Sequence, residues 1–538
     1  MNSLCLPEDV LARIFLYCDV SDLFSCKLVS RSMASTVEHD VYLQYKIELA
    51  VNGMVDLSNA GLDEHTGDPT HLPVVARLQK LREYATRFRS GKFKDSYWEY
   101  SWERGTVDTN GWEVQLAFGS AISYVVIKPP QQEISVCAPP LLDGGMRRWT
   151  IPLTAFPADV VTAVSLDLSQ DLLIVAQLVP NSLGVKAHVR SFSEPAVPHA
   201  DAARPIFSTE PLVLRVLEPG VERTRITYVQ IHRHVVAWML TVDGHDSSDV
   251  EVWDWKTGYL IWRCHFYLGV TFTLLDQSFL AIVPNASDAL LVYRHDLPEA
   301  DPITTRSRQI LELRLPGRPR AETAITRIQE TSIPVRPSST VPFWPDPDLR
   351  MFVVVLGDCS ALLIPYSTFR TLLYHPESVR TSPRGRAKPI PWKNWGPQAT
   401  LLLHLPYAER VNFWTYWKMR YCYSYGSRVA ISCYSDYGTS HTGEVFVFDL
   451  NPWAAREARR YPPTMSPDSR YLDTPTTAKA AFGTERAAIP HAILHEGGLS
   501  RSFGQAPPVL AMDHRGYTTV YTQDLVSSRY LGSISFYV

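Results

Sequence analysis

From about residue 97 to residue 538, apolar and polar residues alternate in short runs that are separated by turn residues. The pattern is clearest at 249–264, where the strand DVEVWDW, a Lys-Thr-Gly turn and the strand YLIWRC follow one another. Two more runs, at 161–179 and 271–283, each predict a hairpin around polar turn residues. A period of two is typical of half-buried strands. Most of this chain must therefore fold as short antiparallel strands, which leaves helices for its beginning.

The strand–turn–strand units recur, and each has an aspartate near a turn. Recurring small antiparallel sheets favour a β-propeller, and a pair of β-sandwiches is the alternative. Residues 250–254 with Thr257 and Gly258 resemble the end of a WD-type propeller blade, and 291–296 and 445–450 resemble it more weakly. The spacing is wider than the ~40–45 residues of a WD blade, and the Gly-His pair is absent. We therefore predict a multidomain α + all-β chain, in which a helical bundle precedes a degenerate propeller of about seven blades.

Composition changes mark the predicted domain organisation. Residues 1–54 form the helical domain, 55–96 a linker with an amphipathic helix, and 97–538 the β-domain. Three stretches rich in Pro, Arg, Ser and Thr, at 298–345, 372–400 and 454–508, predict loop insertions on the propeller rim. Within 74–94, seven basic residues face one acidic residue. We interpret this as the solvated face of the linker helix, and a patch for a membrane or an acidic partner is the alternative.

Bulk properties exclude several classes of protein. The net charge of −3 argues against a general nucleic-acid binder. The eight cysteines include no C-x-x-C pair, so neither a disulfide scaffold nor a zinc module is expected, and a reducing compartment fits better. Glu8 and Asp9 stand where a secretory signal would be basic and then apolar. We expect a soluble protein of the cytoplasm or nucleus, without a membrane partner.

Motifs that carry catalysis are missing from the sequence. We find no P-loop, no G-x-G-x-x-G, no G-x-S-x-G and no H-E-x-x-H. His232 and His234 share a strand face, but two ligands do not make a metal site. Asp243, Asp246 and Asp249 do not fit the calcium-loop spacing. We therefore expect no cofactor, no metal and no catalytic residue; the alternative is a propeller enzyme whose active site lies in the central channel.

The first 50 residues are helical in pattern and unusually apolar. Pro7, Glu8 and Asp9 predict a helix start, and Ser21 is expected to cap a second helix. The apolar residues of the first helix cover an arc of about 160°, wider than the ~100° stripe of a surface helix. They are Val10, Leu11, Ile14, Phe15, Tyr17 and Cys18. Since about 45 residues are near the lower limit for independent folding, this surplus requires a second protein to cover it.

The same residues carry a family resemblance. Leu6-Pro7-x-Asp9-Val10-Leu11-x-x-Ile14-Phe15, then Asp22-Leu23, Cys26-Lys27-x-Val29-Ser30-Arg31 and Leu43, resembles the F-box. The run from Leu43 to Met54 is similar to F-box proteins of basidiomycete fungi, which commonly carry a long β-rich partner domain. Met33 stands where the family often has an aromatic residue, and methionine can fill such a gap.

This resemblance implies a function and a set of contact residues. F-box proteins dock on a Skp-type adaptor of the SCF (cullin–RING) ubiquitin ligase and hold a substrate with the rest of the chain. The resemblance thus implies the substrate-recognition subunit of such a ligase, which acts in ubiquitin-dependent degradation and reaches cullin and RING subunits through the adaptor. A scaffold that binds the adaptor without ubiquitin transfer is the alternative. The adaptor-binding residues implied by motif position are Leu6, Pro7, Val10, Leu11, Ile14, Leu23, Cys26, Val29 and Leu43.

One strand suggests where a protein substrate could bind. In 409–426, one face carries Asn412, Trp414, Tyr416, Lys418 and Arg420. Exposed Trp, Tyr and Arg are the residue types that anchor protein interfaces. We therefore predict substrate binding by Trp414, Tyr416 and Arg420, and two-sided packing between neighbouring sheets is the alternative.

Overall fold

The computed structural model of the chain describes a helical beginning and the strands that follow it. The described ranges are 6–56, 72–89, 94–101, 113–118, 122–128, 133–138, 147–152, 161–167, 170–179, 184–211, 224–242, 247–285, 287–296, 309–316, 326–328, 342–357, 360–374, 387–404, 417–437, 440–454, 492–503, 509–512, 516–525 and 528–537.

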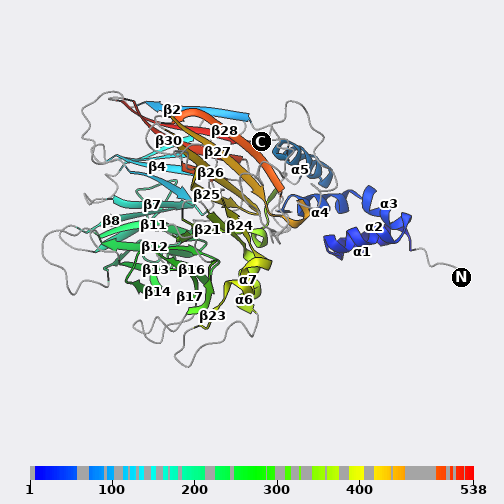
Figure 1. Ribbon diagram of the computed structural model, residues 1–538, viewed down its shortest axis with the longest axis horizontal. Coiled ribbons are helices and arrows are strands. Elements are labelled where there is room, and N and C mark those ends of the chain that lie inside the picture. Colours follow the sequence, from blue (N-terminus) through cyan, green and yellow to red (C-terminus); the bar gives the residue numbers. More distant parts are fainter. Residues whose placement is uncertain are drawn as a thin grey trace.

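The N-terminal region is helical, as the sequence predicts. Its elements are α1 (Glu8–Tyr17), α2 (Val20–Val29), α3 (Arg31–His39), α4 (Val41–Val51), the short strand β1 (Met54–Asp56) and α5 (Val74–Arg89). These helices lie together at one end of the molecule, with the N-terminus outermost and the β-rich region on the other side (Figure 1).

The β-rich region consists of several antiparallel sheets, each built mainly from strands that are consecutive in the sequence. The first is β3 (Glu113–Phe118), β4 (Ile122–Lys128), β5 (Glu133–Ala138) and β6 (Arg147–Pro152). The second is β7 (Val161–Asp167), β8 (Leu172–Leu178), β9 (Val185–Ser191) and β10 (Ile206–Thr209). The third is β11 (Thr224–His232), β12 (Val235–Val242), β13 (Ser248–Asp254) and β14 (Tyr259–Phe266).

The next two sheets are larger or interrupted by helices. The fourth is β15 (Val270–Leu274), β16 (Phe279–Pro284), β17 (Ala289–Arg294), β18 (Gln309–Arg314) and the parallel strand β23 (Pro389–Ile390). The fifth is β19 (Thr326–Ile328), β21 (Met351–Leu356), β22 (Ser360–Pro365) and β24 (Leu401–His404). Helices α6 (Tyr366–Tyr374) and α7 (Trp392–Ala399) lie between β22 and β24 in the sequence.

The last two sheets complete the region. The sixth is β25 (Trp417–Tyr425), β26 (Arg428–Tyr437), β27 (Ser440–Asp449) and β28 (Ala492–Phe503). The seventh is β29 (Val509–Met512), β30 (Gly516–Leu525), β31 (Ser528–Tyr537) and β2 (Lys94–Ser101). Strand β2 pairs antiparallel with β31, so the first and last described strands after α5 share one sheet. Within the residues that the structure describes, no closed propeller is detected, and the expected number of seven blades is not confirmed.

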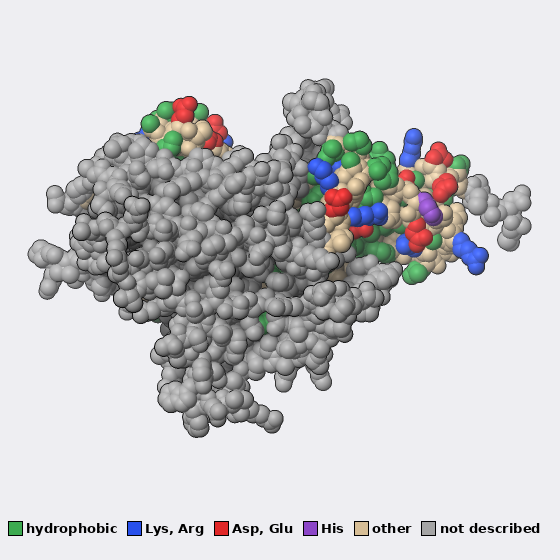
Figure 2. All heavy atoms as spheres, turned by 90° about the horizontal axis from the view of Figure 1, so that it is seen from above, with side chains coloured by type: hydrophobic (Ala, Val, Ile, Leu, Met, Phe, Trp, Pro, Cys, Tyr) green, Lys and Arg blue, Asp and Glu red, His purple; other side chains and the backbone are tan. Residues whose placement is uncertain are grey.

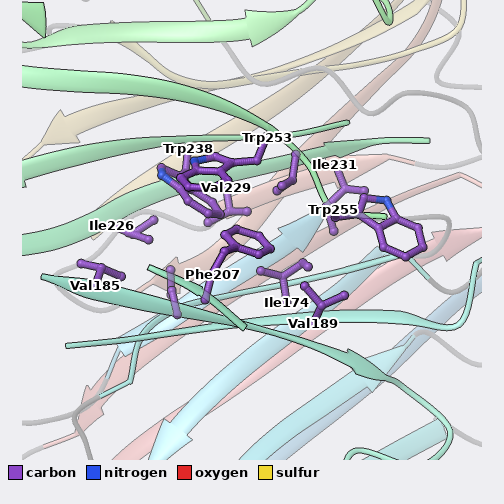
Figure 3. Packing of buried hydrophobic residues seen from close by; sticks show 14 of the residues in the cluster. Ile174, Val185, Val189, Phe207, Ile226, Val229, Ile231, Trp238, Trp253 and Trp255 are labelled. Carbon is purple, nitrogen blue, oxygen red and sulfur yellow. The ribbon is translucent and has the colours of Figure 1, made fainter. Parts of the chain in front are cut away.

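The core lies between neighbouring sheets, as the close view of the second and third sheets illustrates (Figure 3). Phe207 of β10 stacks on Trp238 and Trp253 of the third sheet, with ring centroids 5.3 and 4.8 Å apart. Strands β16, β21 and β22 are buried along almost their whole length. Both faces of these strands are therefore covered, which explains why their sequences are nearly continuous apolar runs rather than alternating ones.

One buried carboxylate departs from simple alternation. Glu251 of β13 is fully buried, and its carboxylate accepts hydrogen bonds from Thr209 Oγ1 (2.5 Å), Trp238 Nε1 (2.8 Å) and Trp253 Nε1 (2.9 Å). Arg263 Nε lies 3.1 Å from the same carboxylate. Burial raises the pKa of Glu251. These partners compensate the cost of burying a charged group, so they join the second and third sheets at this point.

The three predicted loop insertions contain regular elements, so the prediction does not hold for those stretches. Residues 298–345 include β18, β19 and β20 (Phe343–Pro345); 372–400 include β23 and α7; and 454–508 include β28. Strands β18 and β28 pair with the preceding strands of their sheets, and this pairing outweighs the local composition. Helix α7 has one proline at its N-cap, Pro391, and a second proline, Pro397, inside the helix.

Candidate functional site: the helical surface and its junction with the sheets

Each of the helices α1 to α4 begins at a recognisable sequence signal. Pro7 is the N-cap of α1, and Glu8 and Asp9 occupy the first turn, where the helix dipole favours acidic side chains. The cap of α2 is Asp19 rather than the predicted Ser21. The Asp19 carboxylate accepts a hydrogen bond from the backbone N–H of Asp22 at 2.8 Å. Ser21 donates its hydroxyl to the same carboxylate at 2.6 Å, and this bond lowers the pKa of Asp19.

Polar contacts fix the other helices of the bundle. Ser30 caps α3 and Asp40 caps α4, each by accepting hydrogen bonds from backbone N–H groups of the first turn. Lys46 of α4 donates to the carbonyl oxygens of Leu16 (2.8 Å) and Cys18 (2.5 Å) at the end of α1. A cation at the end of a helix satisfies carbonyl groups that have no partner within it, and here it also ties α1 to α4.

The bundle has a small apolar core. Phe15, Leu23, Val37 and Leu43 are buried at its centre. The partly buried residues around them are Leu11, Cys18, Cys26, Met33 and Ile47. Met33 thus packs against the core at the position where an aromatic residue was expected from the resemblance.

Much of the remaining apolar side-chain surface of the bundle is exposed. Tyr17 is 92% exposed, Leu28 87% and Val29 70%. Other exposed large hydrophobic residues of the helices are Leu6, Val10, Ile14, Leu16, Tyr42 and Val75. Figure 2 shows hydrophobic side chains at the surface of this end of the molecule, among charged ones. Removing apolar side chains such as these from water is favourable, so this surface is suited to contact with an apolar partner.

The structure divides the predicted adaptor-binding residues into three groups. Leu6, Pro7, Val10, Ile14 and Val29 are exposed. Leu11 and Cys26 are half-buried and pack against the core.

Leu23 and Leu43 are fully buried, contrary to their predicted place on the docking surface. Motif position does not show which way a residue faces; only the packing of the four helices does. The residues implied by motif position also leave out the exposed Tyr17 and Leu28, although Tyr17 lies within the wide apolar arc of the first helix.

A short strand begins the junction between the helices and the sheets. Strand β1 pairs antiparallel with β20, from Met54 opposite Pro345 to Asp56 opposite Phe343. Gly53 precedes β1 in the left-handed region (φ +64°), and its carbonyl oxygen accepts a hydrogen bond from the backbone N–H of Asp346 at 2.9 Å. An apolar cluster surrounds this pairing and consists of Tyr45, Leu49, Met54, Leu78, Leu81 and Phe343.

A buried polar chain extends the junction to α5. Arg428 of β26 is buried, and its guanidinium contacts the Tyr84 hydroxyl of α5 and lies 3.5 Å from Asp449 Oδ2. Burial lowers the pKa of Arg428, but the Tyr84 and Asp449 oxygens outweigh it and raise the pKa overall. Asp449 Oδ1 in turn accepts hydrogen bonds from Ser427 Oγ (2.7 Å) and the Asn451 backbone N–H (3.0 Å).

The residues that follow β27 complete the junction. The Asn451 side-chain amide donates to the carbonyl oxygens of Ala50 (2.7 Å) and Val51 (2.9 Å) at the end of α4. Trp453 stacks on Phe24 of α2, with ring centroids 5.3 Å apart. Nothing in the sequence indicated these contacts, since Asn451 and Trp453 simply follow a strand-like run and lie about 400 positions from their partners.

Helix α5 has the predicted amphipathic character. It buries Leu78, Leu81 and Ala85. Its outer side lines a shallow groove of about 460 Å³ formed by Val75, Leu78, Gln79, Arg82, Glu83 and Thr86. Arg82 reaches α4, where its Nε lies 3.2 Å from Glu48 Oε1 and its Nη2 donates to Gln44 Oε1 at 2.9 Å. At least one basic residue of this helix, Arg82, therefore makes polar contacts within the chain.

Two of the three predicted substrate-binding residues lie outside the described residues. These are Trp414 and Tyr416, while Arg420 lies in β25 and its side chain is outside the described part. The far end of β25 can still be placed. Its last residue, Tyr425, adjoins the junction, because Gly426 packs against Pro345 of β20. A nine-residue strand spans about 25 Å, so Trp417 lies that far from the junction.

Among the histidines and aspartates singled out in the sequence, His232 and Asp249 have surroundings that the structure describes. His232 ends β11 and is half-buried; burial, helped by Arg350, lowers its pKa to about 3. Asp249 pairs with Arg263 Nη2 (3.0 Å) and His265 Nδ1 (2.6 Å). Asp243 and Asp246 lie outside the described residues. Among the residues that the structure describes, no three His, Cys, Asp or Glu side chains are placed to hold a metal ion.

Comparison with known proteins identifies the N-terminal region. A protein-family model, "F-box domain", matches residues 3–44. No curated protein matches the chain. None of the described helices combines the length and the apolar character needed to span a membrane.

Solved structures resemble the chain only distantly. "Kuenenia stuttgartiensis Hydrazine Synthase" is 9% identical, with a TM-score of 0.28 over 76% of this chain and 79% of that one. "Oligogalacturonate lyase in complex with manganese" is 9% identical, with a TM-score of 0.31 over 82% of this chain and 98% of that one. At such scores neither likeness supports a statement about this protein.

Proposed function

We propose that this chain is the substrate-recognition subunit of an SCF-type ubiquitin ligase. The observation that carries the proposal is the F-box domain at residues 3–44, combined with exposed apolar side chains on the same helices. An F-box typically binds a Skp-type adaptor. The exposed side chains supply apolar surface that such a partner would cover.

The proposed docking surface is the exposed part of the motif together with its neighbours. It consists of Leu6, Pro7, Val10, Ile14, Tyr17, Leu28 and Val29. Leu23 and Leu43 belong to the core of the bundle. Leu11 and Cys26 are partly buried and pack against this core. Burial of several such side chains at the centre of an interface is the usual source of protein–protein affinity.

We propose that the seven larger sheets are the blades of a β-propeller. Three observations support this arrangement. The sheets follow one another in chain order, and nearly every pair of successive sheets is in contact through first strands, as at β3–β7, β7–β11, β11–β15 and β25–β29. Strand β2 completes the last sheet, which is how a propeller can close with strands from both ends of its chain.

The substrate would bind at the strand ends farthest from the helices. Arg420 is the fourth residue of β25, about 17 Å along the strand from its junction end, and Trp414 and Tyr416 precede this strand in the sequence. Tyr267 and Leu268 are exposed just before the start of β15, and their apolar side chains favour the same face as the place where a substrate would bind. The other end of β15 is near the junction, since Arg350 Nη2 donates to the Leu275 carbonyl and Leu349 lies beside Gly53.

No residue of this chain would perform covalent chemistry in this role. The adaptor would connect the chain to cullin and RING subunits, and the β-rich region would hold the target protein near the ubiquitin-conjugating enzyme. Tethering converts an encounter in solution into one at high effective concentration.

Recovery of partners by the tagged full chain tests the proposal. The wild type should recover a Skp-type adaptor and cullin. The double variant Val10→Asp, Ile14→Asp should weaken adaptor binding about a hundredfold, because two charges would be buried in an apolar interface. Tyr259→Asp, an equally drastic change at an exposed residue of β14, should bind like the wild type.

The remaining outcomes separate the alternatives. Recovery of the adaptor without cullin would favour a scaffold without ubiquitin transfer. Failure of the wild type to bind the adaptor would overturn the proposal. Equal binding by the wild type and the double variant would overturn the assigned docking surface.

A further inference from the structure

The segment from Asp449 to Trp453 contacts the helical region at separate places. Asn451 binds the last carbonyl groups of α4, Trp453 stacks on α2, and Asp449 reaches Tyr84 of α5 through Arg428. The β1–β20 pairing adds another attachment. One loop of the sixth sheet therefore takes part in holding α2, α4 and α5.

We propose that Asn451 and Trp453 are positioning residues, which hold the F-box helices in one orientation on the β-rich region. This inference rests on the proposed function, since the orientation matters there: it sets where a bound target lies relative to the adaptor. The two residues contact the end of α4 and Phe24 of α2, so they act through the bundle.

The contacts of Asn451 are well suited to this role. The last carbonyl groups of a helix have no partner inside the helix and need one from elsewhere. The Asn451 amide supplies hydrogen bonds to two of them while its own side chain is fully buried. Its Oδ1 accepts the backbone N–H of Trp453 at 3.1 Å, so Asn451 also sets the place of the indole. Loss of this amide would take the donor from the carbonyl of the buried Val51, whereas the Ala50 carbonyl would keep its hydrogen bond from the backbone N–H of Gly53 at 3.1 Å.

The places of attachment resist rotation in different directions. Strand pairing at β1 involves only three residues, so this pairing alone would be a short attachment. Asn451 acts at the end of α4 and Trp453 acts on α2. Because these contacts are made to two different helices, the bundle cannot turn on the β-rich region without breaking at least one of them. The effective concentration of a tethered group depends on this stiffness.

Hydrogen exchange of the full chain measures the attachment directly. The reporters are the amides of Asn52, Gly53 and Asp346, which donate to Glu48, Ala50 and Gly53. In Asn451→Ala these amides should exchange about tenfold faster, since two hydrogen bonds are lost. Amides of β8, in the core of the second sheet, should be unchanged, which shows that the variant is folded. Asn394→Ala, the same change at an exposed position of α7, is the matched control.

A functional assay separates positioning from mere stability. With purified adaptor, cullin and RING subunits, the probe is ubiquitin transfer to the lysines of the chain itself, located by peptide mapping. Asn451→Ala and Trp453→Ala should bind the adaptor as tightly as the wild type but modify a broader set of lysines. Trp453→Phe, which keeps an aromatic ring against Phe24, should restore the wild-type set.

Two results would overturn the inference. One is unchanged exchange of the three reporter amides in Asn451→Ala. The other is an unchanged set of modified lysines in both alanine variants. Failure of the wild type to bind the adaptor would refute the proposed function instead, and the exchange experiment would still decide whether Asn451 holds the helices in place.

Discussion

The ring of Phe24 in α2 stacks on the indole of Trp453, with ring centroids 5.3 Å apart and planes inclined by 29°. One ring belongs to the F-box helices and the other to the loop after β27. The pair therefore joins two regions that an F-box motif alone would leave independent. It also covers part of the Phe24 ring, which is half-buried.

The first prediction concerns this stack. A double-mutant cycle of Phe24→Ala and Trp453→Ala should give a coupling free energy of about 1 kcal/mol, because the rings interact directly. The opening free energy of α2 amides, measured by hydrogen exchange, provides the readout. Phe24→Ala combined with Trp392→Ala, whose indole packs on Trp395 instead, should be additive. Additivity in the first cycle would show that the stack contributes nothing.

The second prediction separates core from docking residues within the same helix. Leu23→Ala should destabilise the bundle by about 2–5 kcal/mol, since it opens a cavity at a fully buried site. Val29→Ala should change the free energy of unfolding by less than about 0.5 kcal/mol, because its side chain is mostly exposed. It should nevertheless weaken adaptor binding. Hydrogen exchange and titration with the adaptor measure the two effects, and the opposite ranking would contradict the division.

The third prediction addresses Gly53, where α4 turns into β1. Its φ of +64° is costly for other residues, and an added Cβ would lie 3.0 Å from Ser427 Oγ. Gly53→Ala should therefore destabilise the junction by about 1–2 kcal/mol. Gly53→Asn should cost less, because asparagine tolerates the left-handed region. Equal losses of unfolding free energy in the two variants would show that the contact with Ser427, rather than the backbone conformation, sets the cost.

The fourth prediction is a pH dependence. Burial lowers the pKa of His232 to about 3 in the folded chain, whereas an unfolded histidine titrates near 6.5. The folded state thus favours the neutral ring. This stabilisation is fully present above pH 6.5 and is lost as the pH falls from there toward 3, because the unfolded chain then binds a proton that the folded chain excludes.

The loss from this one group should be about 1 kcal/mol between pH 6.5 and 5.5. His232→Gln removes the titrating group, so its free energy of unfolding should fall less over this interval. Urea unfolding of the wild type and the variant at both pH values measures the difference. The same loss in both proteins would contradict the role of His232.

Local sequence patterns predicted individual strands and hairpins better than they predicted how these elements pack together. The hairpins at 161–179 and 271–283 are the pairs β7–β8 and β15–β16, because turn residues and alternation act within a few positions. The loops predicted at 298–345, 372–400 and 454–508 fail in part, since β18, β19, β23 and β28 are stabilised by strands elsewhere in the chain. The way in which the sheets pack against one another depends on contacts between distant segments, which no local sequence pattern indicates.

The sequence by itself determined that the chain starts with helices bearing more apolar surface than they can bury, and that short antiparallel strands follow. It also carried the F-box motif at residues 3–44. Only the tertiary structure decided that Leu23 and Leu43 point inward, that Val10, Ile14 and Val29 stay exposed, and that Asn451 caps α4. The reason is physical: periodicity and capping are set by neighbouring residues, whereas the direction of a side chain and the partner of a helix end are set by packing between distant segments.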